Sequence, residues 1–276
     1  MCELLGMSSN LPATITLSLM KLAEHGGFTG PHRDGWGVAY YEGADVRLLK
    51  EAEAAARSDW VRFIRDHSLK SHLVIAHVRR ATMGERAYRN TQPFARELVG
   101  RMHLFAHNGW LPGILDSPGF RSTRFQPVGE TDSEQAFCAL LDRMADVWKQ
   151  AEDVPALGTR LSIVSSFAAE MRSLGPANFL YSDGDALFAH GDRRRRAETS
   201  VVAPPGLVSI ERRCRKGEHG FVTSGLSIDG ADQSVTLVAS VPLTDEIWQP
   251  LAEGEVVALC KGEIAARRSA GVRPVL

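Results

Sequence analysis

The chain lacks the features that mark several large classes of protein. It holds only four cysteines, Cys2, Cys138, Cys214 and Cys260, and no two of them form a C-x-x-C pair, which excludes zinc-ribbon and redox motifs. No stretch reaches the roughly 18 consecutive apolar residues that a membrane-spanning helix needs. No basic segment followed by an apolar run opens the chain, so a secretory signal is not expected. We therefore expect a cytoplasmic protein with free thiols and no membrane partner.

An excess of one charge is also missing, because the formal net charge is −1 over 276 residues. Such a balance gives no general attraction to nucleic acid or to anionic membranes. Two local basic clusters, at 193–196 and 212–216, carry no interleaved aromatic residues, which argues against a platform for single-stranded nucleic acid. They are interpreted as solvated loops, and an anionic substrate or an acidic partner surface is the alternative.

The sequence shows no internal repeat and no long Pro/Gly/Ser linker, so we expect residues 1–276 to form a single domain. Apolar periodicity predicts strands first, then two long helices, then more strands, an order that indicates an α+β layered sandwich. The expected strands are 2–7, 36–41, 46–50, 72–77, 102–106, 179–181, 186–189, 235–241 and 255–259. The expected helices are 14–25, a short helix capped by Ser58, a helix behind Thr131, and 156–173.

Cysteine stands directly after the initiator methionine. Once Met1 is removed, Cys2 carries both a thiol and a free α-amine, whose ordinary pKa values are about 8.5 and about 7.7–8.0. Such a residue is a nucleophile with its own base, able to attack a carbonyl carbon and to pass a proton to the leaving group. Taken alone, a cysteine at position 2 is better explained as a chance occurrence.

Five short motifs occur in order along the first half of the chain, and each of them is weak by itself. They are MCELLG at 1–6, DGWG at 34–37, HVRRAT at 77–82, FAHNG at 105–109 and GETDSE at 129–134. In this order they resemble the class II glutamine amidotransferases, a branch of the N-terminal-nucleophile hydrolases, and among these the stand-alone bacterial YafJ-type subgroup. The resemblance implies a four-layer αββα sandwich with Cys2 as the nucleophile.

The resemblance also implies roles for four further residues. Arg79 matches the arginine that binds the glutamine α-carboxylate, for which its planar guanidinium is suited; the alternative is a surface ion pair. Asp132 matches the acceptor for the α-ammonium, and it can also complement the dipole of the helix that it starts. Asn108 and Gly109 match the oxyanion hole, where a side-chain amide and a backbone N–H meet the developing negative charge. Without the other motifs, Asn-Gly is a turn signal.

Two more residues of the third motif, His77 and Thr82, are expected to line or buttress the pocket. His77 ends an apolar strand and is interpreted as a hydrogen-bonded core group. His103 and His107 lie four apart on an expected strand, so their side chains project from one face about 13 Å apart. That distance is too long for one metal ion, and we expect neither a metal nor another cofactor.

Three positions depart from the commoner pattern of the family. Arg80 stands where many relatives carry tryptophan, Met83-Gly84 replaces His-Gly, and Gln92 replaces a histidine. These changes lie beside Arg79, so they bear on substrate preference more than on the hydrolytic mechanism. Arg80 either favours a more anionic γ-glutamyl substrate or points to solvent.

The reaction that the resemblance implies is glutamine plus water giving glutamate and ammonia, through a γ-glutamyl thioester on Cys2. No synthase domain is expected after the glutaminase region, so the ammonia passes to a partner protein or is simply released. Two alternatives remain open. One is hydrolysis of a γ-glutamyl conjugate of a small metabolite, and the other is a non-catalytic glutamine-sensing subunit that keeps the pocket.

Overall fold

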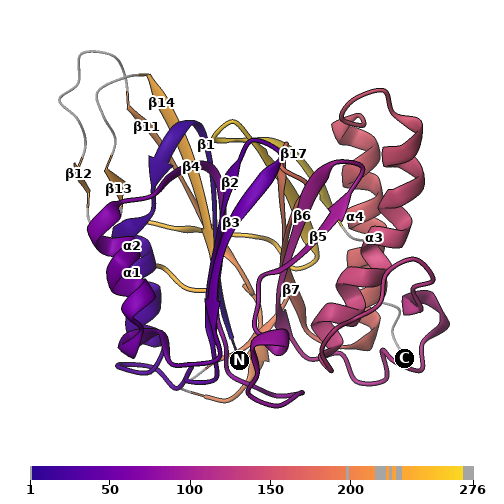
Figure 1. Cartoon of the computed structure of the whole chain (residues 1–276), viewed down its shortest axis with the longest axis horizontal. Helices are drawn as coiled ribbons and strands as arrows, with labels where there is room; N and C mark the ends of the chain where they lie inside the picture. The colour runs from indigo at the N-terminus through magenta and orange to yellow at the C-terminus, as the bar shows by residue number, and fades with distance from the viewer. Residues whose placement is uncertain (1, 197–198, 215–221, 224–225, 228–231, 270–276) are drawn as a thin grey trace.

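Two antiparallel sheets stand face to face at the centre of the computed structural model, which describes residues 2–196, 199–214, 222–223, 226–227 and 232–269 (Figure 1). The first sheet has the order β15 (Gln249–Pro250), β11 (Val208–Cys214), β14 (Gln233–Ala239), β1 (Glu3–Thr14), β4 (Lys70–Val78), β2 (Trp36–Glu42) and β3 (Asp45–Glu51), with β12 (Val222–Thr223) paired to β13 (Leu226–Ser227) and β13 to β1. The second has the order β17 (Glu263–Ser269), β16 (Glu255–Cys260), β8 (Leu187–Gly191), β7 (Ala177–Ser182), β6 (Arg101–Gly109) and β5 (Phe94–Leu98). A short pair, β9 (Arg194–Arg195) and β10 (Val202–Ala203), stands apart.

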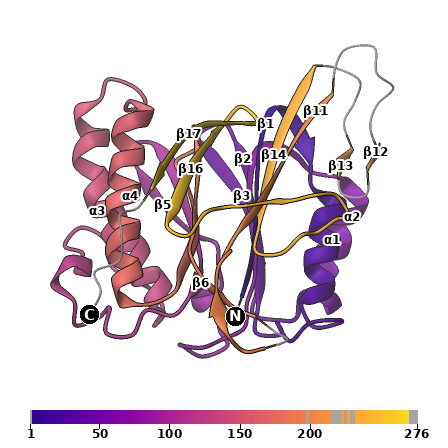
Figure 2. The same ribbon diagram turned by 180° about the vertical axis from the view of Figure 1, so that it is seen from behind.

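Helices cover the outer face of each sheet, which gives the four layers αββα that the sequence predicted (Figures 1 and 2). The first sheet is covered by α1 (Thr16–His25) and α2 (Asp59–His67), and the second by α3 (Asp132–Gln150) and α4 (Leu157–Leu174). Short 3₁₀ turns lie in the connections, at η1 (Ala55–Arg57), η2 (Tyr88–Asn90) and η3 (Pro118–Phe120). Within the described residues, none of the helices has the length and apolar character needed to cross a membrane.

The two expected N-terminal caps are present. The Ser58 hydroxyl accepts from the Val61 N–H at the start of α2, and the Thr131 hydroxyl accepts from the Glu134 N–H at the start of α3. Both bonds satisfy a backbone donor that the first turn of a helix leaves without an intrahelical partner. The capping box at Thr131 is only half formed, because the Glu134 carboxylate accepts from the Gly129 N–H.

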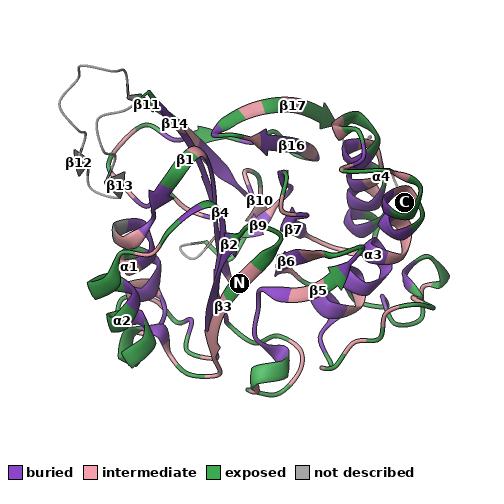
Figure 3. Ribbon diagram, turned by 45° about the horizontal axis from the view of Figure 1, so that its top comes forward, coloured by how far each residue is buried: buried purple, intermediate pink, exposed green. Residues whose placement is uncertain are grey.

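Alternation along β1 sets the direction of the site residues. Leu4 belongs to the apolar cluster between the sheets, whereas Leu5 and Met7 belong to the cluster under α1 and α2. Because side chains alternate along a strand, Cys2 and Gly6 share the inter-sheet face with Leu4. Gly6 allows the sheets to approach closely, since a Cβ there would lie 2.9 Å from Leu187. Burial is concentrated in these interior faces (Figure 3).

Besides the two-residue strands β9, β10, β12, β13 and β15, three longer strands lie outside the sequence-based expectations. These are β5, β11 and β17, which form edges or near-edge positions of the two sheets. In addition, β1 continues to Thr14 rather than stopping near Met7. Its bulge between Ser8 and Ala13 interrupts the pairing with β4, so the simple alternation that identifies a strand is lost there.

Candidate active site

The Cys2 thiol lies half-buried at the start of β1, the strand with neighbours on both sides near the middle of the first sheet. Its Sγ accepts from the Arg80 N–H at 3.2 Å, and its S–H reaches the Arg80 carbonyl at 3.3 Å. Burial raises the pKa of the Cys2 thiol, against the lowering effects of the Arg80 N–H and the Arg79 charge, while Asp132 raises it further. The structure therefore brings Arg79 and Asp132 into electrostatic range of Cys2.

Arg79 is held by main-chain carbonyls. Its side chain is buried, and its Nη atoms donate to the carbonyls of Met83, Gly84 and Glu85 at 2.9–3.1 Å and to that of Asp34 at 3.4 Å. This arrangement rules out the alternative of a surface ion pair. Burial lowers the pKa of Arg79, opposed by the charges of Cys2 and Asp34. Carbonyl dipoles thus fix the guanidinium next to Cys2 and leave its net charge for an anionic ligand.

The DGWG motif at 34–37 holds the segment after β4 that carries Arg79 and Arg80. The Asp34 carboxylate accepts from the Ala81 N–H at 2.8 Å, and the Gly35 carbonyl accepts from the Arg79 N–H at 2.7 Å. Both bonds hold the chain where it leaves β4. The DGWG motif therefore positions the segment that carries Arg79 and Arg80.

Asp132 begins α3 and is buried. Its Oδ2 accepts from the Leu111 N–H at 2.9 Å, and its Oδ1 accepts from the Ser133 N–H at 2.8 Å and hydroxyl at 3.2 Å. The helix-dipole role is therefore present in the geometry, together with a tie to the chain just beyond Gly109. A carboxylate has about four lone-pair directions, so these bonds leave capacity for an ammonium donor.

Asn108 is fully buried near the end of β6. Its Nδ2 donates to the Ser240 hydroxyl at 3.2 Å, and the same hydroxyl accepts from the Leu4 N–H at 3.0 Å. Its Oδ1 has no hydrogen-bond partner among the described residues. Ser240 therefore links the candidate oxyanion donor to the strand that begins beside the nucleophile.

Gly109 ends β6 at a position with no room for a side chain. A Cβ there would lie 2.0 Å from the Pro176 carbonyl oxygen and 2.4 Å from His107 Nε2. His107 is in turn 2.9 Å from the Ser133 hydroxyl, which bonds to Asp132. Glycine is required here because two neighbouring segments approach the backbone closely, not because Asn-Gly makes a turn after the strand.

His77 and Thr82 differ in their surroundings. His77 is fully buried on β4, as expected of a core group, although neither ring nitrogen makes a hydrogen bond of ordinary geometry among the described residues. Burial lowers the pKa of His77 to about 3, which makes it neutral at pH 7; the nearby main chain of His107 acts in the opposite direction. Thr82 is exposed, in the loop that follows Arg79.

The two histidines of β6, His103 and His107, have different surroundings. His103 Nδ1 is 2.8 Å from the Tyr181 hydroxyl. His107 Nδ1 is 2.9 Å from the hydroxyl of Ser133, which bonds to Asp132. In the part of the chain that the structure describes, no group of three or more His, Cys, Asp or Glu side chains could hold a metal ion. Gln92, the departure from a family histidine, accepts from the His107 N–H at 2.6 Å and so supports β6.

The interpretation of the basic clusters as solvated loops is wrong for Arg194 and Arg212. Arg194 is buried, and its guanidinium donates to the Ser240 carbonyl. Arg212 forms an ion pair with Glu246. Both side chains have partners in the folded protein, which a run of basic letters does not reveal. Residues 215–216 of the second cluster, like Met1, lie outside the described residues.

Sequence reasoning missed Ser240 and Asn178. Asn178 Nδ2 donates to the Asn108 carbonyl at 3.1 Å, and its Oδ1 accepts from the Asp192 N–H at 2.8 Å. A buried asparagine within an otherwise apolar strand was a usable signal, because such a group needs hydrogen-bond partners. Ser240 follows an ordinary strand and carried no such signal.

A cysteine at the start of a central strand, between two antiparallel sheets that helices cover on both sides, defines the N-terminal-nucleophile hydrolase fold. The glutamine phosphoribosylpyrophosphate amidotransferase of Bacillus subtilis has this fold, with a TM-score of 0.57 and 16% identity over 98% of this chain and 49% of that chain. The chain belongs to the class II glutamine amidotransferases, since residues 1–273 match the family described as "Glutamine amidotransferases class-II".

Individual relatives agree with this membership. YafJ of Escherichia coli (strain K12), whose name marks it as a proposed glutamine amidotransferase, is 38% identical over 269 residues, or 95% of this chain and 99% of YafJ. A similarly named protein of Haemophilus influenzae is 31% identical over 95% of this chain and 85% of its own length. The crystal structure of a predicted glutamine amidotransferase from Pseudomonas aeruginosa PA01 has a TM-score of 0.64 and 35% identity, over 96% of this chain and 100% of that chain. The resemblance found in the sequence is therefore confirmed.

Proposed function

We propose that this chain, acting as one domain, hydrolyses the side-chain amide of glutamine through a γ-glutamyl thioester on Cys2. The observation that carries the proposal is the assembly around the thiol. The residue after Arg79 bonds to Cys2 Sγ through its main chain, and Asn108 is joined through Ser240 to the strand that begins beside Cys2. Asp132 is tied to the chain just beyond Gly109 through the Leu111 N–H. In the proposed complex, Arg79 holds the α-carboxylate and Asp132 the α-ammonium, while His77 and Thr82 border the ligand.

Burial raises the pKa of the Cys2 thiol, so the resting side chain is protonated at pH 7 and needs a base. The α-amine of Cys2, once free, is the base in this proposal. It takes the thiol proton as Sγ attacks the amide carbon, and the oxyanion meets Asn108 Nδ2 and the Gly109 N–H. The C–N bond breaks as the amine returns the proton, and ammonia leaves. Water then hydrolyses the thioester to glutamate and regenerates the thiol.

The released ammonia either goes to a partner protein or leaves to solvent in this proposal. No nucleic acid, membrane or cofactor takes part. We place the enzyme in the cytoplasm, and the support for that location is that Cys2, Cys138 and Cys260 are free thiols.

Glutamate release from glutamine tests the proposal directly. Protein with a verified free Cys2 amine should release glutamate, and Cys2→Ala should lower the rate by at least about 10³-fold, as expected for removal of a nucleophile. Cys260→Ala is the matched control, because this half-buried thiol on β16 lies in the other sheet and should not matter.

Two outcomes would overturn the proposal. Glutamate release that survives Cys2→Ala would exclude the thioester route. Tight glutamine binding without release, in protein whose Cys2 amine is verified as free, would instead support the sensing subunit.

A further inference from the structure

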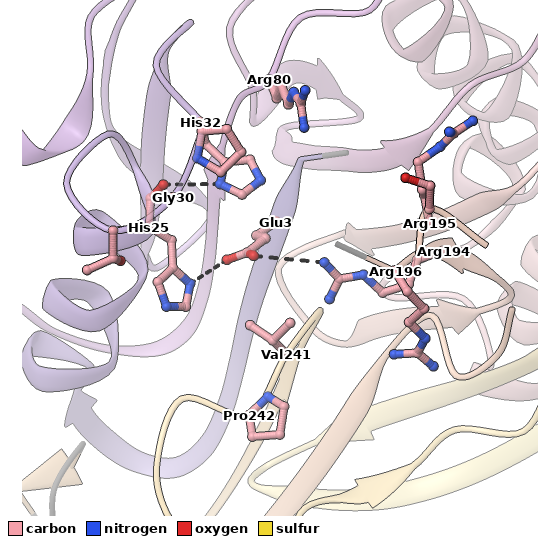
Figure 4. A pocket seen from close by; sticks show the side chains of 13 residues that line it. Glu3, His25, Gly30, His32, Arg80, Arg194, Arg195, Arg196, Val241 and Pro242 are labelled. Atoms are coloured by element: carbon pink, nitrogen blue, oxygen red, sulfur yellow. Dashed lines mark hydrogen bonds and ion pairs between the residues drawn. The ribbon is translucent and has the colours of Figure 1, made fainter. Parts of the chain in front are cut away.

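A cavity of about 660 Å³ lies near the start of β1 (Figure 4). Its wall comes from β1, the loop after α1, the loop after β4, β9 and the segment after β14. Two wall residues adjoin the nucleophile, because Glu3 follows Cys2 in the chain and Arg80 bonds to Sγ through its main chain. The volume lies within the range of small-molecule sites, roughly 300–1,000 Å³.

Positive charge dominates the wall of this cavity. Arg80, Arg194, Arg195 and Arg196 all line it, whereas Glu3 is the carboxylate among the described residues that line it. Arginine guanidinium groups are the side chains best suited to carboxylates, phosphates and sulfonates, because their planar N–H fork matches two oxygens at once. The cavity is therefore suited to a ligand that carries a carboxylate, phosphate or sulfonate group.

The charge of Glu3 is already matched by neighbours. Its carboxylate is 2.7 Å from His25 Nδ1 and 3.8 Å from Arg194 Nη2, as the dashed lines in Figure 4 mark. The hydrogen bond to Glu3 raises the pKa of His25, against the effect of its burial. The negative charge of Glu3 is therefore balanced within this pair. Arg80 is an exposed residue of the wall and can turn toward a ligand, and Arg195 adds a second exposed arginine to the wall.

Two of the arginines are fixed in place. Arg194 donates to the Ser240 carbonyl, and Ser240 also bonds to Asn108. Arg196 donates to the carbonyls of Pro204 and Pro205 at 2.6 and 3.2 Å. A ligand that binds such preordered groups loses less conformational entropy than one that must organise loose side chains. The same arrangement couples the cavity to the candidate oxyanion donor.

Arg79 and Arg80 follow β4 in succession, and their side chains go to different places. Arg79 reaches the carbonyls of residues 83–85, whereas the next residue, Arg80, points into the cavity. Figure 4 shows the Arg80 side chain directed toward Glu3 and Arg194. In the proposed complex, a substrate whose glutamyl end is held by Arg79 extends past Cys2 toward the Arg80 side chain.

We propose that this cavity binds an oxyanion on the amine portion of a γ-glutamyl amide, so that the preferred substrate is a γ-glutamyl conjugate of an anionic amine. This inference rests on the proposed function, since it uses the same nucleophile. Cys2 Sγ attacks the amide carbon, the C–N bond breaks as the amine takes a proton and leaves, and the thioester forms in that step. Water then hydrolyses the thioester to glutamate and the free thiol. Free glutamine is then a smaller substrate that leaves the cavity unfilled.

Steady-state kinetics on four substrates tests the proposal. These are glutamine, neutral γ-glutamylglycinamide, γ-glutamylglycine with a carboxylate, and γ-glutamyl-aminomethylphosphonate with a phosphonate. We expect kcat/KM for one of the anionic amides to exceed that of the neutral amide by roughly tenfold, the size of one charge-assisted interaction. The carboxylate and phosphonate arms show which oxyanion the cavity takes.

Variants show whether the arginines cause this preference. Arg80→Gln and Arg195→Gln should each lower the anionic-to-neutral ratio of kcat/KM by several-fold, and Arg195→Lys should retain part of it because the charge remains. Arg47→Gln on β3, an exposed arginine that pairs with Glu42, should leave the ratio unchanged. Equal kcat/KM for anionic and neutral amides, or a ratio that neither cavity variant changes, overturns the proposal. An acidic protein surface would then be the partner for this cluster.

Calorimetry on the Cys2→Ala variant separates this inference from the proposed function. Tighter binding of γ-glutamylglycine than of γ-glutamylglycinamide, with the difference reduced by Arg195→Gln, supports the anion site even if the native enzyme releases no glutamate. Cys2-dependent hydrolysis without any preference for the anionic amides leaves the hydrolase standing and removes the anion site.

Discussion

The polar side chains around Cys2 are positioned by uncharged partners. Arg79 is held by carbonyl oxygens, and Asn108 is held by the Ser240 hydroxyl. Neutral partners fix the direction of a donor without cancelling its charge. They occupy the Arg79 Nη donors and one N–H of the Asn108 amide, which leaves the Arg79 charge and the second Asn108 N–H for a substrate. The arrangement is preordered before any ligand arrives, which is what electrostatic stabilisation of a transition state needs.

Removing the Asn108 amide should therefore affect the chemical step. We expect Asn108→Ala to lower kcat for glutamate release by about 10²–10³-fold, because one oxyanion donor is lost. The control is Ser240→Ala, which removes the hydroxyl that orients the amide but keeps the donor itself. Its kcat should fall about tenfold or less, a loss that remains smaller than that of a missing donor. Equal losses in both variants would mean that Asn108 acts only through its packing.

The start of α3 gives two neighbouring residues separate tasks. Thr131 caps the helix through the Glu134 N–H, and Asp132 directs its carboxylate to the Leu111 N–H and to Ser133. A helix whose first turn frays would release the Asp132 carboxylate from this position. The stability of one cap is thus coupled to the geometry of the site.

Replacing the cap tests this coupling. Thr131→Ala should lower the free energy of unfolding by about 0.5–2 kcal/mol, because the Glu134 N–H loses its acceptor. It should also raise KM for glutamine more than it lowers kcat. Urea unfolding followed by circular dichroism gives the first value, and steady-state kinetics gives the second. Thr131→Ser keeps the hydroxyl and should stay within a few tenths of a kcal/mol of the native protein. A similar loss in both variants would assign the effect to the threonine methyl group.

Local sequence patterns predicted the elements that have a buried face and a clear end signal. The helices behind Ser58 and Thr131, the strand that ends just before Arg79 and the strand that carries Asn108 are examples. β17 was not predicted, because Ile264 and Ala266 are its only half-buried apolar residues and its other side chains are mostly exposed. An edge strand of this kind takes its structure from pairing with β16 rather than from its own periodicity.

Only the site residues that lie within the sequence motifs could be predicted from the sequence. Cys2, Arg79, Asn108 and Asp132 come from segments with a recognisable order, and the fold brings those segments together. Ser240 contacts Leu4 and Asn108 because β14 pairs with β1 and the second sheet packs across it. Such a contact depends on the register of strands distant in the sequence, which local pattern does not encode.

The apolar layer between the sheets holds the two halves of the site in register. One sheet supplies Cys2 and Arg79 and the other supplies Asn108, and Leu180 and Leu187 pack between them against Gly6. The distance between nucleophile and oxyanion donor therefore depends on how the two sheets stack. Close packing in this layer has a structural and a catalytic consequence at once.

A substitution that leaves a cavity in this layer should therefore lower the free energy of unfolding. Leu180→Ala should lower the free energy of unfolding by about 2–5 kcal/mol, the range for truncation of a fully buried leucine. Chemical denaturation measures this loss. Leu115→Ala, at a leucine with 57% of its side-chain surface exposed, should change stability by less than about 0.5 kcal/mol. Similar small effects at both positions would show that the layer between the sheets is not close-packed.

The placement of β1 beside β14 has a consequence for synthesis on the ribosome. Leu4 and Ser240 are 236 positions apart, although they bond directly. At about 5–20 residues per second, the ribosome needs on the order of ten to fifty seconds to deliver the second partner after the first. A chain terminated before residue 240 would carry the thiol and Arg79 but would lack the hydroxyl that holds the Asn108 amide. Incomplete translation products are therefore not expected to consume glutamine.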